Sequence, residues 1–405
     1  MSSPTPPPST SAQDPSGAPA STPLPRGFTC HVASIGIKDT SDDFVVVAAD
    51  TRCAAAGMFT KSRFAGPSVV VSREHVADHA AQAVVVISKN ANVATGDEGL
   101  ANAREVVIGV AAALGCDADD VLIASTGVIG RQYPMDRVRA GLAALEAPFA
   151  GRDALAVATG MMTTDTVAKL ATASVAGSEA VVVGVAKGVG MIEPDMATMI
   201  TLLFTDADVD ADALDQMFRA VVDRTFNCVS IDTDTSTSDT AIVLASGAAG
   251  PADNGALLAA LFEVSVSLTK QIARDGEGAE KLIEVTVDGA RDDDQARRVA
   301  KAIVNSPLVK TAVHGADPNW GRVAMAIGKC SDDTDIDERD VVIRFGEHEC
   351  YPTRVEDAGL ATLADYLRRD EIEINVSLGI ADGTATVWGC DLTDGYIRIN
   401  ADYTT

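Results

Sequence analysis

The chain has 405 residues, of which 47% are hydrophobic and 4% aromatic, and its formal net charge is -26 at pH 7. This length exceeds what one hydrophobic core usually supports, so we expect two domains or one large layered unit. The negative charge would repel phosphate backbones and anionic lipids, which argues against a nucleic-acid or membrane partner.

The seven cysteines are scattered along the chain without a Cys-x-x-Cys pair. We therefore expect reduced thiols, as in cytoplasmic proteins. His75 and His79 have the spacing of two ligands on one helix face, but they lie in a polar segment that is more typical of a solvated surface. The sequence thus predicts no metal site.

The first 26 residues contain eight of the sixteen prolines, with Ser, Thr and Ala between them. This composition predicts a disordered tail at 1–26. The tail lacks the basic start and apolar run of a signal peptide, and no later segment has about 18 uninterrupted apolar residues. We expect a soluble, cytoplasmic protein.

Three valine-rich runs follow at 44–49, 68–72 and 83–88. Each is short and bounded by polar residues, so all three are predicted to be neighbouring strands. A helix is predicted at 98–114, because Gly115 supplies the usual C-terminal breaker.

A strand predicted at 121–125 leads directly into Thr126 and Gly127. Glycine at the end of a strand allows backbone N–H groups to turn toward a ligand without interference from a Cβ. An ordinary strand-to-helix turn explains the same residues, because a helical stretch is predicted to open at Pro134 and run to Leu145.

Thr198 lies between two apolar segments, 180–186 and 199–205, that are predicted to be strands. The loop before it contains two glycines and a proline, which break regular structure. In this position the Thr198 hydroxyl could attack the carbonyl of Ala197 and cut the chain. The new α-amino group, with a pKa near ~8, could then act as the base for the same hydroxyl. A structural threonine at the start of a strand is the simpler alternative.

The rest of the chain alternates predicted helices and strands, which favours an α/β fold. Helices are predicted at 210–224, 255–274, 294–304, 322–327 and 358–368, and strands at 282–287, 341–345, 373–377 and 384–389. The segment 232–240 alternates Asp and Thr but lacks the spacing of a calcium loop, so we interpret it as a hydrogen-bonded loop near the site. The C-terminal sequence, from residue 396, would ordinarily fray.

Six segments invite comparison with a known family: STGVIGRQYPM (125–135), MTTDT (162–166), KGVGMIEPDMATM (187–199), FNCVSIDTDTSTSDT (226–240), DGEGAEKLIEV (275–285) and HGADPNWGRVAMAIG (314–328). In this order they resemble the ornithine acetyltransferases, the glutamate N-acetyltransferases of arginine biosynthesis, including relatives in clavulanic acid producers. The resemblance runs from about Gly27 to Thr405. Six segments in register are far more specific than any one of them.

The resemblance implies an α/β fold with two mixed-sheet domains, outer helices and a self-cleaving architecture like that of the N-terminal-nucleophile enzymes. Cleavage between Ala197 and Thr198 would divide the chain into 27–197, after the tail, and 198–405. Thr198 would be the nucleophile, and Thr126 with Gly127 would form the oxyanion hole. The implied substrate contacts are Thr164 (with Thr163 as the alternative), Lys187, Thr198, Glu277, Asn400 and Thr405.

The implied reaction moves an acetyl group from N-acetylornithine to glutamate through an acetyl-threonine, in a ping-pong sequence. The Glu277 carboxylate could hold the δ-ammonium of ornithine. No cofactor motif is present, since KGVG is too short for a P-loop. Glu193 and Asp195 stand where many members that also use acetyl-CoA carry His and Asn, which favours the acetylornithine-only form.

Two alternatives remain open from the residues. One is a related self-processing aminopeptidase, and the other is an uncleaved protein that binds amino acids. The expected partners are small-molecule substrates, and the family resemblance implies a heterotetramer of two copies of each fragment. Both primary arginine synthesis and a secondary-metabolite pathway are compatible with these residues.

Overall fold

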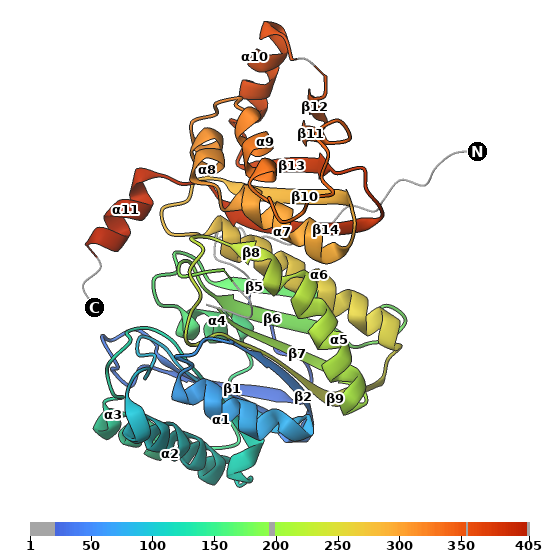
Figure 1. Cartoon of the computed structure of the whole chain (residues 1–405). Coiled ribbons are helices and arrows are strands. Elements are labelled where there is room, and N and C mark those ends of the chain that lie inside the picture. Colours follow the sequence, from blue (N-terminus) through green and yellow to red (C-terminus); the bar gives the residue numbers. More distant parts are fainter. Residues whose placement is uncertain (1–20, 194–198, 354, 403–405) are drawn as a thin grey trace.

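The computed structural model describes residues 21–193, 199–353 and 355–402, and these form two mixed β-sheets surrounded by helices (Figure 1). Sheet one has eight strands in the order β4-β3-β2-β9-β7-β6-β5, with β1 paired to β2. Its strands are β1 (Phe28–Ala33), β2 (Phe44–Phe59), β3 (Ala80–Ile87), β4 (Val121–Ser125), β5 (Lys169–Ser174), β6 (Val181–Lys187), β7 (Ile200–Asp208) and β9 (Thr240–Pro251). The expected α/β class with two mixed sheets is confirmed.

Sheet two has six strands in the order β12-β11-β13-β10-β14-β8. These are β8 (Val229–Ser230), β10 (Leu282–Ala290), β11 (Val342–Phe345), β12 (His348–Tyr351), β13 (Glu371–Ser377) and β14 (Gly383–Cys390). The central strand β10 runs parallel to β13 and antiparallel to β14. Its buried residues Ile283, Val285 and Val287 alternate with more polar ones, as expected for a strand whose two faces meet different neighbours.

The helices cover the sheets in layers (Figure 1). α1 (Pro67–His75), α2 (Gly96–Leu114) and α3 (Met135–Ala143) cover the half of sheet one that contains β4, whereas α4 (Ala154–Met161) packs on β1, β2, β5 and β6. α5 (Ala211–Arg224) contacts β2, and α6 (Asn254–Arg274) contacts β5 and β6 of sheet one and β10 and β14 of sheet two. α7 (Asp293–Val304) packs on β10 and β14 and is followed by α8 (Pro307–His314), α9 (Gly321–Gly328) and α10 (Asp357–Tyr366). The last helix, α11 (Asp394–Ala401), stands to one side of both sheets.

Strand β2 links the two halves of sheet one. Its first part pairs with β3, and its second part, Ala54–Phe59, pairs with β9. Buried apolar residues of β2, β3 and β4 form a common core with α4 and with residues of β6, β7 and β9. One apolar layer therefore spans both halves of sheet one.

Helix α6 is the one helix in the described ranges that is long and apolar enough to cross a bilayer by length and composition. Half of its most apolar window is buried, and its contacts join it to strands of both sheets. These contacts explain its apolar character, because a helix between two sheets buries side chains on more than one face.

The predicted strand at 68–72 is wrong, because these residues belong to α1. Pro67 stands in the first turn of that helix, where its missing N–H has no cost. Val69 and Val71 are fully buried, so packing of the helix overrides the strand preference of valine. By contrast, the strand predicted at 121–125 is β4 without any change of bounds.

The proposed boundary between residues 197 and 198 does not separate the two sheets. β6 precedes it and β7 follows it, yet these strands pair antiparallel from Val182↔Thr205 to Lys187↔Ile200. Because β7 and β9 both lie between β2 and β6, sheet one needs strands from both sides of the boundary.

Candidate active site

Three strand ends meet in one row of sheet one. Lys187 at the end of β6 pairs with Ile200 at the start of β7, and Ile200 pairs in turn with Thr240 at the start of β9. Ala197 and Thr198, the expected cleavage site and nucleophile, precede Ile200 in the sequence but lie outside the described residues. The site is therefore built here from the groups that surround Lys187.

Lys187 and Thr126 come from different halves of sheet one and are joined by a hydrogen bond. The Lys187 Nζ donates to the Thr126 Oγ1 at 3.2 Å. The Thr126 N–H donates to the Ile87 carbonyl at 3.1 Å, so the hydroxyl hydrogen is the donor that Thr126 can still offer to a ligand. Burial lowers the pKa of Lys187, while the charge of Asp165 opposes this shift.

Gly127 occupies a backbone position that excludes other residues. Its φ is 128°, outside the region that L-residues adopt readily. A Cβ at this position would collide with the backbone of Lys89 and Asn90. The glycine is thus required for the close approach of the turn after β4 to the end of β3.

A buried ion cluster supports the loop 162–166. Lys169 is fully buried, and its Nζ donates to Asp165 Oδ1 at 2.8 Å and to Asp275 Oδ2 at 2.6 Å. Asp165 Oδ1 also accepts the Gly188 N–H at 2.7 Å. Burial alone would raise the pKa of Asp165, but the charges of Lys187 and Lys169 outweigh it and lower the pKa to about 2. Asp165 is therefore a carboxylate that fixes both the loop and the segment after Lys187.

Three of the expected substrate contacts converge from distant parts of the chain. The Asn400 Nδ2, on α11, donates to Glu277 Oε2 at 2.9 Å, and the Thr164 hydroxyl donates to Glu277 Oε1 at 3.4 Å. The backbone N–H of Thr163 donates to Asp165 Oδ2 at 3.0 Å, and both threonines line one pocket. Thr405, the remaining expected contact, lies outside the described residues.

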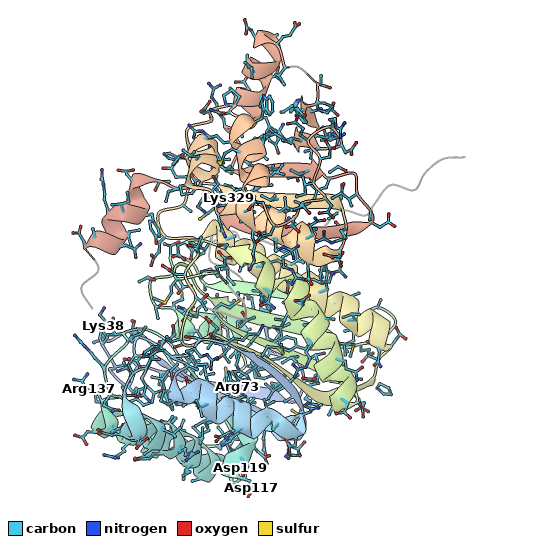
Figure 2. The ribbon with its side chains drawn as sticks, viewed as in Figure 1. Lys38, Arg73, Asp117, Asp119, Arg137 and Lys329 are labelled. Carbon is cyan, nitrogen blue, oxygen red and sulfur yellow. The ribbon has the colours of Figure 1, made fainter. Side chains whose placement is uncertain are left out.

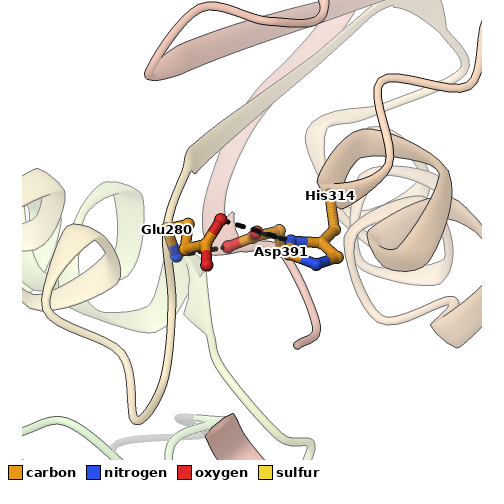
Figure 3. A group of neighbouring side chains, drawn as sticks. All are labelled: Glu280, His314 and Asp391. Carbon is orange, nitrogen blue, oxygen red and sulfur yellow. Dashed lines mark hydrogen bonds and ion pairs between the residues drawn. The ribbon is translucent and has the colours of Figure 1, made fainter. Parts of the chain in front are cut away.

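The turn that follows Glu277 is tied to the chain before α11, where Glu280, His314 and Asp391 lie together (Figure 3). Asp391 Oδ1 accepts the N–H groups of Glu280 and Lys281 at 2.8 and 2.9 Å. The His314 Nδ1 lies 3.0 Å from Asp391 Oδ2 and 3.6 Å from Glu280 Oε2. These are metal-ligand types, and the Asp391 carboxylate also binds two backbone N–H groups, so it holds the turn after Glu277 beside the chain that leads to α11.

The segment 232–240 holds the other side of the site. Asp232 accepts the N–H groups of Met191 and Ile192 at 2.6 and 2.7 Å. The Glu193 N–H donates to the Asp234 carbonyl at 2.9 Å, and its side chain accepts from Asn305 at 2.6 Å. The prediction of a hydrogen-bonded loop near the site is confirmed.

Asp239 is a buried carboxyl that the sequence did not single out. It is 2% exposed, and neither side-chain oxygen has a hydrogen-bond partner in the described ranges. Burial raises the pKa of Asp239 well above the usual value of a carboxyl group. The next residue, Thr240, donates its N–H to the Met199 carbonyl at 3.0 Å, which places Asp239 beside the start of β7.

A pocket of about 270 Å³ opens beside Gly127 and Thr164. Its other walls come from loops before β2 and after β3, and they carry two lysines, Lys38 and Lys89. Lys38 lies on the same side of the molecule as α11 in the view of Figures 1 and 2. The pocket thus extends from the expected oxyanion hole toward a wall that carries two lysines and two carboxylates, Asp39 and Asp42.

The structure brings together six residues that were expected to act at one site: Thr126, Gly127, Thr164, Lys187, Glu277 and Asn400. Sequence reasoning missed the ion cluster around Lys169 and the buried Asp239. Asp165 lies within the hydroxyl-rich MTTDT segment and was the one signal available for that cluster. Asp275, which shares the Lys169 ammonium with Asp165, is 110 residues further along the chain, and no local sequence pattern predicts such a contact.

The chain was compared with families, curated proteins and solved structures. The model of the ArgJ family matches residues 29–405. The glutamate N-acetyltransferase Oat2 of Streptomyces clavuligerus is 58% identical over 387 residues, covering 94% of this chain and 98% of that protein. Among solved structures, the arginine biosynthesis bifunctional protein ArgJ of Bacillus halodurans is 42% identical, covers 49% of this chain and 96% of its own, and has a TM-score of 0.46. The ornithine acetyltransferase of Mycobacterium tuberculosis, solved with ornithine, is 31% identical, covers 42% and 92%, and has a TM-score of 0.39.

Proposed function

Because this chain belongs to the ArgJ family, we propose that it is a glutamate N-acetyltransferase that takes its acetyl group from N-acetylornithine. The observation that carries the proposal is the hydrogen bond between Lys187 and Thr126. This bond lies next to Gly127, and Lys187 pairs with Ile200, two residues after Thr198. In this arrangement the Thr126 hydroxyl hydrogen and the Gly127 N–H can both donate to one reacting oxygen.

The first step of the proposal is cleavage of the chain between Ala197 and Thr198. The Thr198 hydroxyl attacks the Ala197 carbonyl, the acyl group moves from nitrogen to oxygen, and water hydrolyses the ester. The products are a carboxylate on Ala197 and a free α-amino group on Thr198. The pairing of β6 with β7 supports this step, since it holds the chain on both sides of the bond.

Acetyl transfer then uses the same threonine twice. The Thr198 α-amino group accepts the hydroxyl proton while the oxygen attacks the acetyl carbonyl of N-acetylornithine. The Thr126 hydroxyl and the Gly127 N–H stabilise the oxyanion, and such donors typically contribute about 3–4 kcal/mol each. Ornithine leaves, glutamate enters, and its amine attacks the acetyl-threonine to give N-acetylglutamate and the free enzyme.

Substrate binding falls to the groups around Glu277. Its carboxylate suits the δ-ammonium of ornithine, and Thr164 and Asn400 hold that carboxylate in place. Lys187 and Thr405 complete the proposed contacts. The cytoplasmic location and the heterotetramer of two copies of each fragment are further parts of the proposal.

Glu193 supports the acetylornithine-only form of the reaction. Its side chain accepts hydrogen bonds from Asn305 and Ser230, so it is held in the loop before Thr198. With acetyl-CoA in place of N-acetylornithine, we expect no transfer to glutamate above background. Transfer at a comparable rate would assign the chain to the form that uses both donors.

The decisive experiment is the mass of the denatured protein, measured beside Thr198→Ala. We expect fragments 1–197 and 198–405 in the wild type and one full chain in the variant. N-acetylornithine and glutamate should then give N-acetylglutamate with the wild type alone. Acetate release faster than transfer would favour a hydrolase, and an uncut wild-type chain that binds ornithine without turnover would favour a binding protein.

A further inference from the structure

In the proposed reaction, one site must bind two substrates whose side chains have opposite charges. Ornithine carries a δ-ammonium, which suits the Glu277 carboxylate, whereas glutamate carries a γ-carboxylate, which that group would repel. The net charge of -26 makes this repulsion more general. Lys187 is already bonded to Thr126, so a further cationic group is needed for the γ-carboxylate if glutamate is to be the acceptor.

Lys89 supplies one such group in the pocket beside Gly127. Its backbone lies against Gly127, and its φ is 73°, a conformation that a residue with a side chain adopts only when the surrounding structure enforces it. Backbone strain of this kind is concentrated at functional sites. The Nζ donates to Asp39 Oδ1 at 2.7 Å and to the Ser41 carbonyl at 3.0 Å, so the side chain is directed at the pocket wall.

Lys38 supplies the second group. It lines the same pocket, and its ammonium has no ion-pair partner in the described parts of the chain. Asp39 and Asp42 also reach this wall, but the Asp39 carboxylate already accepts from Lys89 and from Ser41. Of the two lysines, Lys38 is free to meet an incoming anion and Lys89 can exchange Asp39 for one.

We propose that this pocket is a subsite for an anionic side chain, where Lys89 and Lys38 receive the γ-carboxylate of the acceptor glutamate. The inference rests on the proposed function and adds to it that the donor and acceptor side chains bind in different places. Glu277 serves the donor, whereas the lysine pocket serves the acceptor, and Thr164 lies between them as part of both. The two half-reactions then share Thr198 but differ in where the side chain lies.

Asp39 gives the proposal a direction that can be tested. Its carboxylate competes with the substrate for Lys89, and with a side chain that is 54% exposed it can be replaced without burying a new group. Asp39→Asn should therefore lower the KM for glutamate, whereas Lys89→Met and Lys38→Met should raise it. Opposite effects from two partners of one ion pair are not expected from a merely structural role.

The test measures acetyl transfer from N-acetylornithine to three acceptors: glutamate, its neutral analogue glutamine, and isotope-labelled ornithine. In Lys89→Met we expect the ratio of glutamate transfer to ornithine exchange to fall about tenfold or more, as is typical when a charged hydrogen bond is removed. The wild-type preference for glutamate over glutamine should disappear. Lys329→Met, an exposed lysine over sheet two (Figure 2), is the matched control and should leave both ratios unchanged.

The outcomes separate this inference from the proposed function. If wild-type protein exchanges ornithine and acetylates glutamate, but Lys89→Met and Lys38→Met keep both ratios, the subsite is refuted and the enzyme stands. If the wild type transfers acetyl to no acceptor, the proposed function fails first. A parallel loss of all three transfers in Lys89→Met, with an unchanged preference for glutamate over glutamine, would assign Lys89 a structural role and overturn the subsite.

Discussion

Two lysine–carboxylate arrangements lie near the candidate site, and they differ in burial and in the number of partners. Lys169 is completely buried between two carboxylates, Asp165 and Asp275, whereas the Lys89 side chain is 9% exposed and pairs with a single carboxylate, Asp39, that is 54% exposed. A buried ion that loses its partner leaves an uncompensated charge, while an exposed pair exchanges partners with water or a ligand at little cost. The comparison indicates that the first arrangement holds the fold and the second is available to substrate.

Lys169→Met tests the buried side of this comparison, and it should have the largest effect on stability. The change removes the ammonium that hydrogen-bonds both buried carboxylates and leaves Lys187 as the cation near Asp165, and we expect the free energy of unfolding to fall by about 3–5 kcal/mol. Chemical denaturation measures this loss. Lys270→Met, which breaks a half-exposed pair with Glu284, is the control and should cost no more than about 1 kcal/mol.

A loss in Lys169→Met as small as that of the control would show that the cluster does not carry the fold. If the variant is too unstable to purify, the double variant Lys169→Met with Asp275→Asn removes one of the two unpaired charges. We then expect part of the lost stability to return, because the penalty comes from the uncompensated carboxylates.

Acid unfolding sharpens the same comparison. The pKa of Asp165 is about 2 in the folded protein against an ordinary value of 3.8, so its stabilisation is complete above about pH 4 and is lost as the pH falls through 2. The difference corresponds to about 2 kcal/mol. Asp165→Asn should remove this part of the pH dependence, which a denaturant series between pH 2 and pH 5 would detect. A slope identical to that of the wild type would contradict the assignment.

Lys89→Met should have the smallest effect on stability. Its partner Asp39 is 54% exposed, and although Lys89 is 9% exposed and also donates to the Ser41 carbonyl, we expect the loss to be about 1 kcal/mol. Thermal unfolding should therefore be nearly unchanged in the variant whose acceptor preference changes most. A large loss of stability would place Lys89 with Lys169 among the residues that hold the fold.

Long, well-delimited segments could be predicted from the sequence because their signals are local. The helix at 98–114 ends where Gly115 adopts a φ of 72°, and the helix after Asp210 begins where that side chain accepts from Ala213. The α11 helix was missed, since it buries none of its residues and has no apolar stripe to reveal it. The 68–72 error has the opposite cause: a buried valine run has no period that separates strand from helix.

The residues of the candidate site that match the family's motifs could be predicted from the sequence. The residues that reach the site only through tertiary contacts could not. Thr126, Gly127, Thr164, Lys187, Glu277 and Asn400 were all named from the sequence. The bonds of Lys169 to Asp275 and of Thr126 to Lys187 span 106 and 61 residues, and no spacing rule connects such positions. The lysine pocket depends on a positive φ at Lys89, which only the folded backbone reveals.

The order of strands in sheet one also bears on synthesis of the chain. The strands β7 and β9 are made after residue 199, yet they occupy the middle of the sheet, between β2 and β6. A nascent chain that has reached only residue 193 must therefore leave a gap at the centre of its own sheet. The row of Lys187, Ile200 and Thr240 is completed only after β9 has been translated and inserted. The topology thus delays cleavage: the groups proposed to cut the chain cannot assemble until the strands on both sides of the cleavage site have been synthesised.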